Sequence, residues 1–459
     1  MRTSSERAIG FKSVASAVMG LALLAIAATP AHAETVRDQQ WHLDAMKADE
    51  IWKVSKGSGI TVAVLDSGVD DTVPDLRGQV LKGKDFSTFR GDENVDIDNH
   101  GTGMAALIAA NGSRGPAQGS YGLAPRAKIL PVRIPYAQER WEQDGSGKSF
   151  AEGMSEAIRF AADSDAKIIN ISVASTEGGS PELTAAVKYA LSKGKLIFAG
   201  VGNTGDKGNE VEYPAATPGV VGVAGVDKKA ARWSKSQWGP QVDLSAPAES
   251  ITNACTGGTQ LCEGSGTSAA TALASASAAV IWSKHPDWTN NQVLRVMLNT
   301  ASKPDNGAKR SDYIGYGVVR PRIALKTPGD PGPANEYPLP DLAAAAPKSP
   351  SPDASKATGG TETDKSQPGA PESASKDDSN TGLFIALGIG TAVLIGAAVS
   401  IPLIRSRRRN AALPTVPPAA PAPYPYQTAQ FPPSYGPPQG GAPDVNSPYG
   451  GHQGPGQPG

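Results

Sequence analysis

Asp66, His100 and Ser268 lie in three short segments that are far apart in this chain of 459 residues, and each is a residue type that acyl-transfer chemistry needs. A serine hydroxyl is a weak nucleophile until an imidazole takes its proton, and a buried carboxylate holds that imidazole in the required tautomer. Each residue alone would more often be a surface or capping residue. Together, in this order, they predict that Asp66 orients His100, which in turn activates Ser268.

The sequence around each of these residues predicts where it lies. Residues 60–64 are mostly β-branched, which predicts a buried parallel strand with Asp66 at its carboxyl end, where open α/β sheets build their sites. Residues 104–110 and 269–282 are small or apolar, which predicts packed helices that begin near His100 and Ser268. A nucleophile at the amino end of a helix lies near the positive pole of the helix dipole.

A further predicted strand, residues 195–201, runs into Asn203. We predict that the Asn203 amide donates a hydrogen bond to the oxyanion of the reaction, together with the backbone N–H of Ser268. Losing such a side-chain donor lowers turnover by roughly 10²–10³.

With these motifs and with residues 213–216, 220–227 and 242–247 in similar order and spacing, the chain resembles the subtilisin-like (S8) serine peptidases over about residues 35–325. Within that family it is similar to the mycosins, the serine proteases associated with actinobacterial type VII secretion. The resemblance implies an α/β, three-layer subtilisin-like fold with a mostly parallel central sheet. It also implies a serine endopeptidase that acts on polypeptides and needs no cofactor.

The resemblance also implies a substrate cleft. One wall of the pocket for the residue before the scissile bond would consist of Ser172, Val173 and Ala174, on a strand edge that pairs with the substrate backbone. The other wall would consist of Gly200, Val201 and Gly202. Because Ala174 stands where relatives have glycine, we expect a narrow pocket entrance and a slim substrate side chain. These walls contain no acidic residue, which disfavours selection of a basic one.

Composition divides the chain into five parts. Basic residues, an apolar stretch and a small-residue site predict a secretory signal peptide, with an uncleaved anchor as the alternative. An uncharged segment followed by arginines predicts a membrane-spanning helix with its carboxyl-terminal side in the cytoplasm. The predicted parts are a signal peptide (1–33), a peptidase domain (34–327), a disordered Pro/Ala/Ser-rich linker (328–382), a single transmembrane helix (383–404) and a cytoplasmic Pro/Gly-rich tail (405–459).

Cys255 and Cys262 are the only two cysteines, and they are close together on the predicted secreted side. A local disulfide is therefore expected, with two free buried thiols as the alternative. No His/Cys cluster has zinc spacing, so no catalytic metal is predicted. The formal net charge of −1 and the lack of a nucleic-acid motif disfavour nucleic acid as a partner.

The sequence therefore predicts a single-pass cell-membrane protein with an extracytoplasmic serine endopeptidase domain. The resemblance to mycosins adds the type VII secretion machinery as an expected partner. A second hypothesis is a non-proteolytic structural or binding component of a secretion complex, built on the same scaffold.

Overall fold

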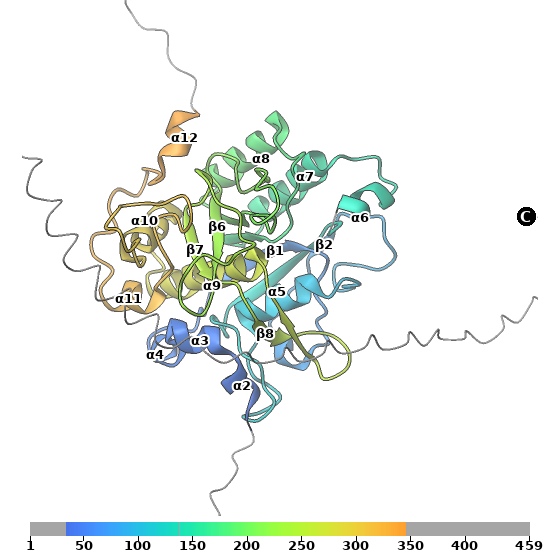
Figure 1. The fold of residues 1–459 in the computed structure, drawn as a ribbon. Helices are drawn as coiled ribbons and strands as arrows, with labels where there is room; N and C mark the ends of the chain where they lie inside the picture. The colour runs from blue at the N-terminus through green and yellow to red at the C-terminus, as the bar shows by residue number, and fades with distance from the viewer. Residues whose placement is uncertain (1–33, 137, 346–459) are drawn as a thin grey trace, which may run out of the picture. The chain divides into compact units, whose positions relative to one another are not determined.

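A computed structural model describes residues 34–136 and 138–345 (Figure 1). The predicted signal peptide, transmembrane helix and cytoplasmic tail lie outside the described residues. Within the described ranges, no helix is both long enough and apolar enough to cross a bilayer.

The fold is organised around a seven-stranded sheet with the order β2-β3-β1-β4-β5-β6-β7. Every neighbouring pair of these strands runs parallel, which confirms the predicted mostly parallel sheet. The strands are β1 (Thr61–Asp66), β2 (Lys84–Asp85), β3 (Lys128–Arg133), β4 (Ile168–Ile171), β5 (Leu196–Gly200), β6 (Val221–Val226) and β7 (Leu244–Pro247).

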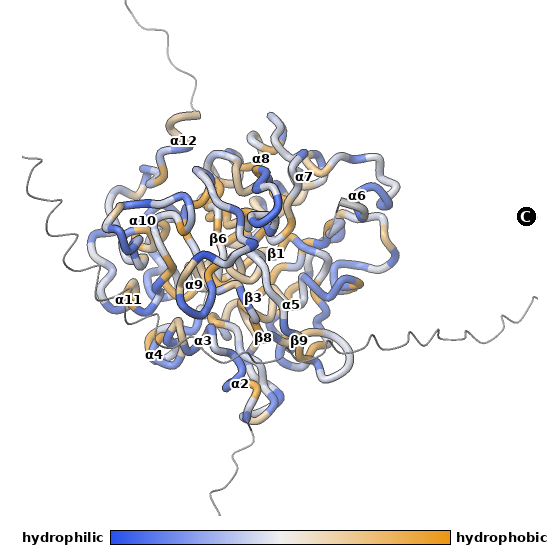
Figure 2. The backbone as a smooth tube through the Cα atoms, viewed as in Figure 1, coloured by the Kyte–Doolittle hydropathy of each residue, from blue (hydrophilic) through white to orange (hydrophobic). Residues whose placement is uncertain are grey.

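Both faces of this sheet are covered, because its strands carry apolar side chains on both sides. In β1, Val62 and Val64 belong to one buried cluster, whereas Ala63 and Leu65 belong to the other. Successive side chains of a strand point to opposite faces, so this alternation separates two hydrophobic layers. Figure 2 shows hydrophobic segments concentrated in the strands and in α9, with hydrophilic segments in the surrounding loops.

Helices on the two faces complete three layers, as predicted. Residues of α7 and α8 share one buried cluster, and residues of α5, α9, α10 and α11 share the other. The helices after the amino-terminal arm are α5 (His100–Ala109), α6 (Gln138–Gln143), α7 (Phe150–Asp163), α8 (Pro181–Ser192), α9 (Thr267–Lys284), α10 (Asn290–Thr300), α11 (Pro321–Lys326) and α12 (Pro340–Ala344), with a 3₁₀ turn η1 at Pro74–Leu76.

The strand order reverses at β1, which is the switch point of the sheet. β3 and β2 lie on one side of β1, and β4 to β7 follow on the other. In parallel sheets, the crevice outside the carboxyl ends of the strands at such a switch point is the usual ligand site. Asp66 is the last residue of β1 and therefore lies at this crevice.

Three short helices form an amino-terminal arm: α2 (Val36–Gln39), α3 (Trp41–Met46) and α4 (Ala48–Trp52). The Gln40 side chain donates to Tyr121 O at 2.8 Å and accepts from Tyr121 N at 3.0 Å, and Leu43 and Ile51 are buried in the core. Trp41 donates from its indole nitrogen to Ser250 O at 2.9 Å. The arm is thus part of the packed domain.

A hairpin of β8 (Ile251–Ala254) and β9 (Leu261–Gly264) precedes α9. A disulfide joins Cys255 and Cys262, whose Cα atoms are 5.8 Å apart, so the predicted pairing is confirmed. The bond closes the loop at the tip of this hairpin. It therefore limits the positions that the loop can take in front of α9.

The packed domain extends beyond residue 327, where the predicted linker begins. Tyr337 donates to Gly219 O at 2.9 Å, and Asp341 accepts from Gly219 N at 2.7 Å. Arg295 donates to the backbone carbonyls of Pro331 and Glu336. The first part of the predicted linker is therefore folded against the domain, because its backbone and a buried Leu339 find partners there, and the rest lies outside the described residues.

Candidate active site

The carboxylate of Asp66 lies next to the imidazole of His100, with 2.7 Å between Asp66 Oδ1 and His100 Nδ1. Asp66 is fully buried, and its Oδ1 also accepts from Ser67 N at 2.8 Å. A carboxylate at Nδ1 favours the tautomer that carries its proton there, which leaves Nε2 as the acceptor. The two predicted residues are therefore placed together in the geometry of an oriented base.

Close packing of α5 against the end of β1 brings His100 to this position. A Cβ atom on Gly101 would lie 2.1 Å from Gly68 O and 3.0 Å from Asp66 Cβ, so only glycine permits the contact. The preceding Asn99 has a φ of 63°, a left-handed conformation that Asn adopts more readily than most residues. Its side chain pairs with Thr256 on the disulfide loop through both N–H···O bonds.

Asp96 also holds the start of α5 against the end of β1. It accepts hydrogen bonds from Ser67 Oγ at 2.7 Å and from Asn99 N at 2.8 Å. Thr102 donates to Asp96 from both its N–H and its hydroxyl group. These bonds fix the first turn of α5 relative to Asp66, so small shifts of the imidazole are resisted.

The surroundings of His100 favour its protonated form. Burial would lower the pKa of the imidazole, but the charge and the hydrogen bond of Asp66, with Asp96 and Asp98 contributing, raise the pKa of His100 above its ordinary value. The ring of Tyr136 lies against the imidazole in a tilted arrangement, with a centroid distance of 4.3 Å. Burial also raises the pKa of Tyr136, so its hydroxyl stays neutral beside these carboxylates.

Ser268 lies in the first turn of α9, as predicted, and is partly exposed. Its hydroxyl donates to Ser172 O at 3.2 Å, and no hydrogen bond joins it to His100 among the described residues. Its backbone N–H has no partner in the described part of the chain, as expected in the first turn of a helix. The N–H is therefore available to a ligand, whereas the hydroxyl would first have to leave Ser172 O.

Polar contacts inside the core hold α9 against β4. Ser275 donates from α9 to Asn170 Oδ1 at 3.0 Å, and Asn170 donates to Ser172 Oγ at 3.1 Å. Ser172 Oγ in turn donates to Ser268 O at 3.3 Å. Because Asn170 is fully buried and paired on both sides, this chain of hydrogen bonds sets the position of Ser268 relative to the sheet.

Asn203 follows β5 and meets the start of α9. Its Oδ1 accepts from Thr267 N at 2.8 Å and from Thr267 Oγ1 at 3.1 Å. Two donors at this end of the amide require an oxygen there, so the Nδ2 group points the other way. That amide nitrogen makes no hydrogen bond to any described residue, and Asn203 is exposed.

The two predicted pocket walls flank this region. Ser172, Val173 and Ala174 follow β4, and the backbone N–H groups of Val173 and Ala174 form no hydrogen bond within the described residues. An extended chain can pair with such an edge. On the other side, Gly202 N donates to Thr267 Oγ1 at 3.3 Å, which holds Gly200, Val201 and Gly202 beside α9.

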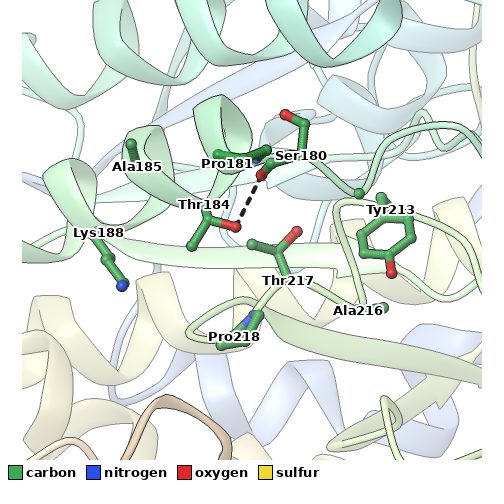
Figure 3. A pocket seen from close by; sticks show the side chains of 10 residues that line it. Ser180, Pro181, Thr184, Ala185, Lys188, Tyr213, Ala216, Thr217 and Pro218 are labelled. Carbon is green, nitrogen blue, oxygen red and sulfur yellow. Dashed lines mark hydrogen bonds between the residues drawn. The ribbon is translucent and has the colours of Figure 1, made fainter. Parts of the chain in front are cut away.

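A separate open cavity of about 570 Å³ lies beside the start of α8 (Figure 3). Thr184 donates to Ser180 O at 3.0 Å on one side of it, and Tyr213 and Thr217 lie on the other. None of the predicted catalytic residues lines it. Elsewhere in the described ranges, no group of three or more His, Cys, Asp or Glu side chains is arranged to hold a metal ion.

Sequence reasoning missed Tyr136, Asp96 and Glu212. Tyr136 follows β3, whose carboxyl end lies next to that of β1, so its position after a strand was a usable signal. Asp96 lies in a loop between elements and offered no such signal. Glu212 directly precedes the 213–216 motif, and it lies against Gly202 although it belongs to neither of the two wall segments, which contain no acidic residue.

Known proteins resemble the chain over this region. The sequence profile of Peptidase_S8, the subtilase family, matches residues 57–317. A thermophilic serine proteinase of Bacillus sp. (strain AK1) is 36% identical over 272 residues, covering 59% of this chain and 63% of that protein. Subtilisin E of Bacillus subtilis (strain 168) is 34% identical over 272 residues, covering 59% of this chain and 66% of its own length. The match thus spans slightly less than two thirds of these relatives.

Solved structures show the same similarity. MycP1 from Mycobacterium smegmatis aligns with a TM-score of 0.56 and 27% identity, covering 67% of this chain and 89% of that one. The MycP3 protease from the type VII (ESX-3) secretion system aligns with a TM-score of 0.52 and 30% identity, covering 62% of this chain and 87% of that one. The family profile covers more than half of the chain, and the fold and the motif order agree with it. The chain belongs to the subtilase family.

Proposed function

We propose that this protein is an extracytoplasmic serine endopeptidase in which Asp66, His100 and Ser268 form the catalytic triad. The observation that carries the proposal is the 2.7 Å contact between Asp66 and His100 at the sheet edge where Ser268 and Asn203 also lie. An imidazole held by a buried carboxylate is the arrangement that activates a serine.

In the proposed reaction, the Ser268 side chain turns away from Ser172 O towards His100. His100 Nε2 takes the hydroxyl proton as Ser268 Oγ attacks the scissile carbonyl carbon. The carbonyl π electrons move to oxygen and form the tetrahedral oxyanion. His100 then gives the proton to the leaving amine as the C–N bond breaks, and water hydrolyses the resulting acyl-enzyme by the same route.

Two donors are available for the oxyanion: Asn203 Nδ2 and the Ser268 N–H. Thr267 holds the oxygen end of the Asn203 amide, so the donor end is oriented before substrate arrives. Preorganised donors of this kind stabilise the charge that develops in the transition state. The proposed roles of Ser172, Val173 and Ala174 are backbone pairing with an extended polypeptide, with Gly200, Val201 and Gly202 opposite.

We further propose that the chain is anchored by the predicted transmembrane helix at 383–404, after a signal peptide at 1–33, and that it works with a type VII secretion machinery. The arginines after residue 404 and the similarity to MycP1 and MycP3 support this. The predicted tail at 405–459 would then be cytoplasmic.

One observation favours the second candidate function, a non-proteolytic component of a secretion complex. In this structure the Ser268 hydroxyl is bonded to Ser172 O rather than to His100. Catalytic hydrogen bonds often form only when substrate binds, so the proteolytic function does not require a Ser268–His100 bond in this structure. Peptide cleavage separates them.

The first prediction concerns the protonation of His100. Because the nearby carboxylates raise the pKa of His100, its imidazole should titrate above the ordinary value of about 6.5. The base must be neutral, so kcat/KM should fall as the pH drops through this raised pKa. Asp66→Asn should lower the pKa, as followed by NMR of the imidazole signal that His100→Gln removes. Asp70→Asn, an acidic residue outside the cited causes of the shift, is the control. An unchanged titration in Asp66→Asn would contradict the coupling.

The second prediction concerns Asn203. Asn203→Ala should lower kcat by about 10²–10³ with little change in KM, because the hydrogen bond forms chiefly in the transition state. Asn209→Ala, in the loop that follows, is the control. Cleavage of an unstructured peptide by Asn203→Ala at the wild-type rate would rule out the oxyanion role. Failure of the wild type to cleave any such peptide would favour the second candidate function.

The third prediction concerns topology. A protease added to intact cells should cut the segment between residue 346 and the predicted transmembrane helix and release the folded domain. An epitope after residue 405 should stay protected until the cells are opened. Cleavage of that epitope in intact cells would reverse the proposed orientation.

A further inference from the structure

The cleft contains an acidic group that neither pocket wall contributes. Ser175 N donates to Tyr213 O at 3.0 Å, and Tyr213 N donates to Ser175 O at 2.9 Å. This pair joins the end of the Ser172–Ala174 wall to the segment that carries Glu212. Glu212 is therefore brought to the place where the cleft walls meet.

The Glu212 carboxyl group lies directly against the other wall. A Cβ atom on Gly202 would be 2.7 Å from Glu212 Cδ and 2.4 Å from Gln237 Nε2. Gly202 has a φ of 109°, so its backbone also favours glycine. The absence of a side chain at Gly202 thus leaves the space that the carboxylate and its amide partner occupy.

Gln237 holds the carboxylate without neutralising it. Gln237 is fully buried, and its Nε2 donates to Glu212 Oε1 at 2.6 Å and to Thr204 Oγ1 at 2.8 Å. Among the described residues, no Lys, Arg or His forms an ion pair with Glu212. Its second oxygen, Oε2, accepts no hydrogen bond within the described ranges and is not a buried atom.

Such a carboxylate lacks a cation. Burial raises the pKa of Glu212, the Gln237 hydrogen bond opposes that rise, and the nearby Glu210 adds to it. A positively charged ligand would offset the cost of burying the charged Glu212 carboxylate, because a partly buried charge is stabilised by an opposite charge. The unbranched stems of Lys and Arg also suit the narrow entrance expected at Ala174.

We propose that Glu212 makes this cleft select a polypeptide with Lys or Arg at the residue before the scissile bond. This specificity rests on the proposed endopeptidase function. This proposal replaces the expectation that a basic substrate residue is disfavoured. That expectation rested only on the two pocket walls, and Glu212 belongs to neither of them.

The test compares two peptides that differ only at the residue before the scissile bond, Arg in one and Met in the other. The full-length wild type should show a higher kcat/KM for the Arg peptide. Glu212→Gln should lower kcat/KM for Arg by roughly 10- to 100-fold, the range expected for a charge-assisted hydrogen bond, and lower the Met value far less. Glu210→Gln removes the same charge from an exposed neighbour and should change neither value. Equal loss for both peptides in Glu212→Gln would indicate a merely structural role and overturn the proposal.

A binding measurement keeps this inference separate from catalysis. In the full-length Ser268→Ala protein, the fluorescent cation p-aminobenzamidine should bind, and Glu212→Gln added to it should weaken that binding roughly 10-fold or more. Binding of the cation without peptide cleavage by the wild type would support the cation site and refute the proposed endopeptidase function. Cleavage of the Arg and Met peptides at equal rates, or cation binding that does not depend on Glu212, would refute the specificity and leave the endopeptidase function standing.

Discussion

The hydrogen bond between Asp66 and His100 depends on one close backbone contact, and the rest of the site is arranged around it. β1 delivers Asp66 to the carboxyl edge of the sheet, and α5 begins directly above that residue. The helix can approach the end of β1 this closely only because Gly101 has no side chain, which would clash with Gly68 O. A pair of residues from distant parts of the sequence is thereby held at 2.7 Å in a buried setting, where the bond is stronger than in water.

Ser268, the proposed nucleophile, is placed by a different set of contacts. α9 is built almost entirely from small residues, so it packs within the domain, and its register is set by polar pairs rather than by shape alone. Asn170 links α9 to β4 through Ser275, while Thr267 links the start of α9 to Asn203. The same first turn therefore positions the Ser268 hydroxyl, its backbone N–H and the Asn203 amide. A change in any of these contacts would move groups that must act together.

The sequence predicted the parts of the site that are tied to regular elements. Asp66 ends a β-branched strand, and His100 and Ser268 begin helices, so local patterns were enough to locate them relative to the sheet. The sequence did not predict the contact of the Tyr136 ring with His100, the hydrogen bonds of Asp96 to the start of α5, or the position of Glu212 against Gly202. Those residues lie in connecting loops, whose paths depend on long-range packing. The end of the domain was misjudged for a similar reason, because the Pro-rich composition after residue 327 conceals contacts such as that of Tyr337 with Gly219.

The central claim is that His100 activates Ser268 as a nucleophile, and covalent labelling tests it most directly. A fluorophosphonate should label the wild-type protein at Ser268, as identified by mass spectrometry of the modified peptide. His100→Ala should lose this labelling, because no base remains to accept the hydroxyl proton. Ser265→Ala, which removes a nearby exposed serine, should be labelled like the wild type. Robust labelling of Ser268 in the His100→Ala protein would contradict the account.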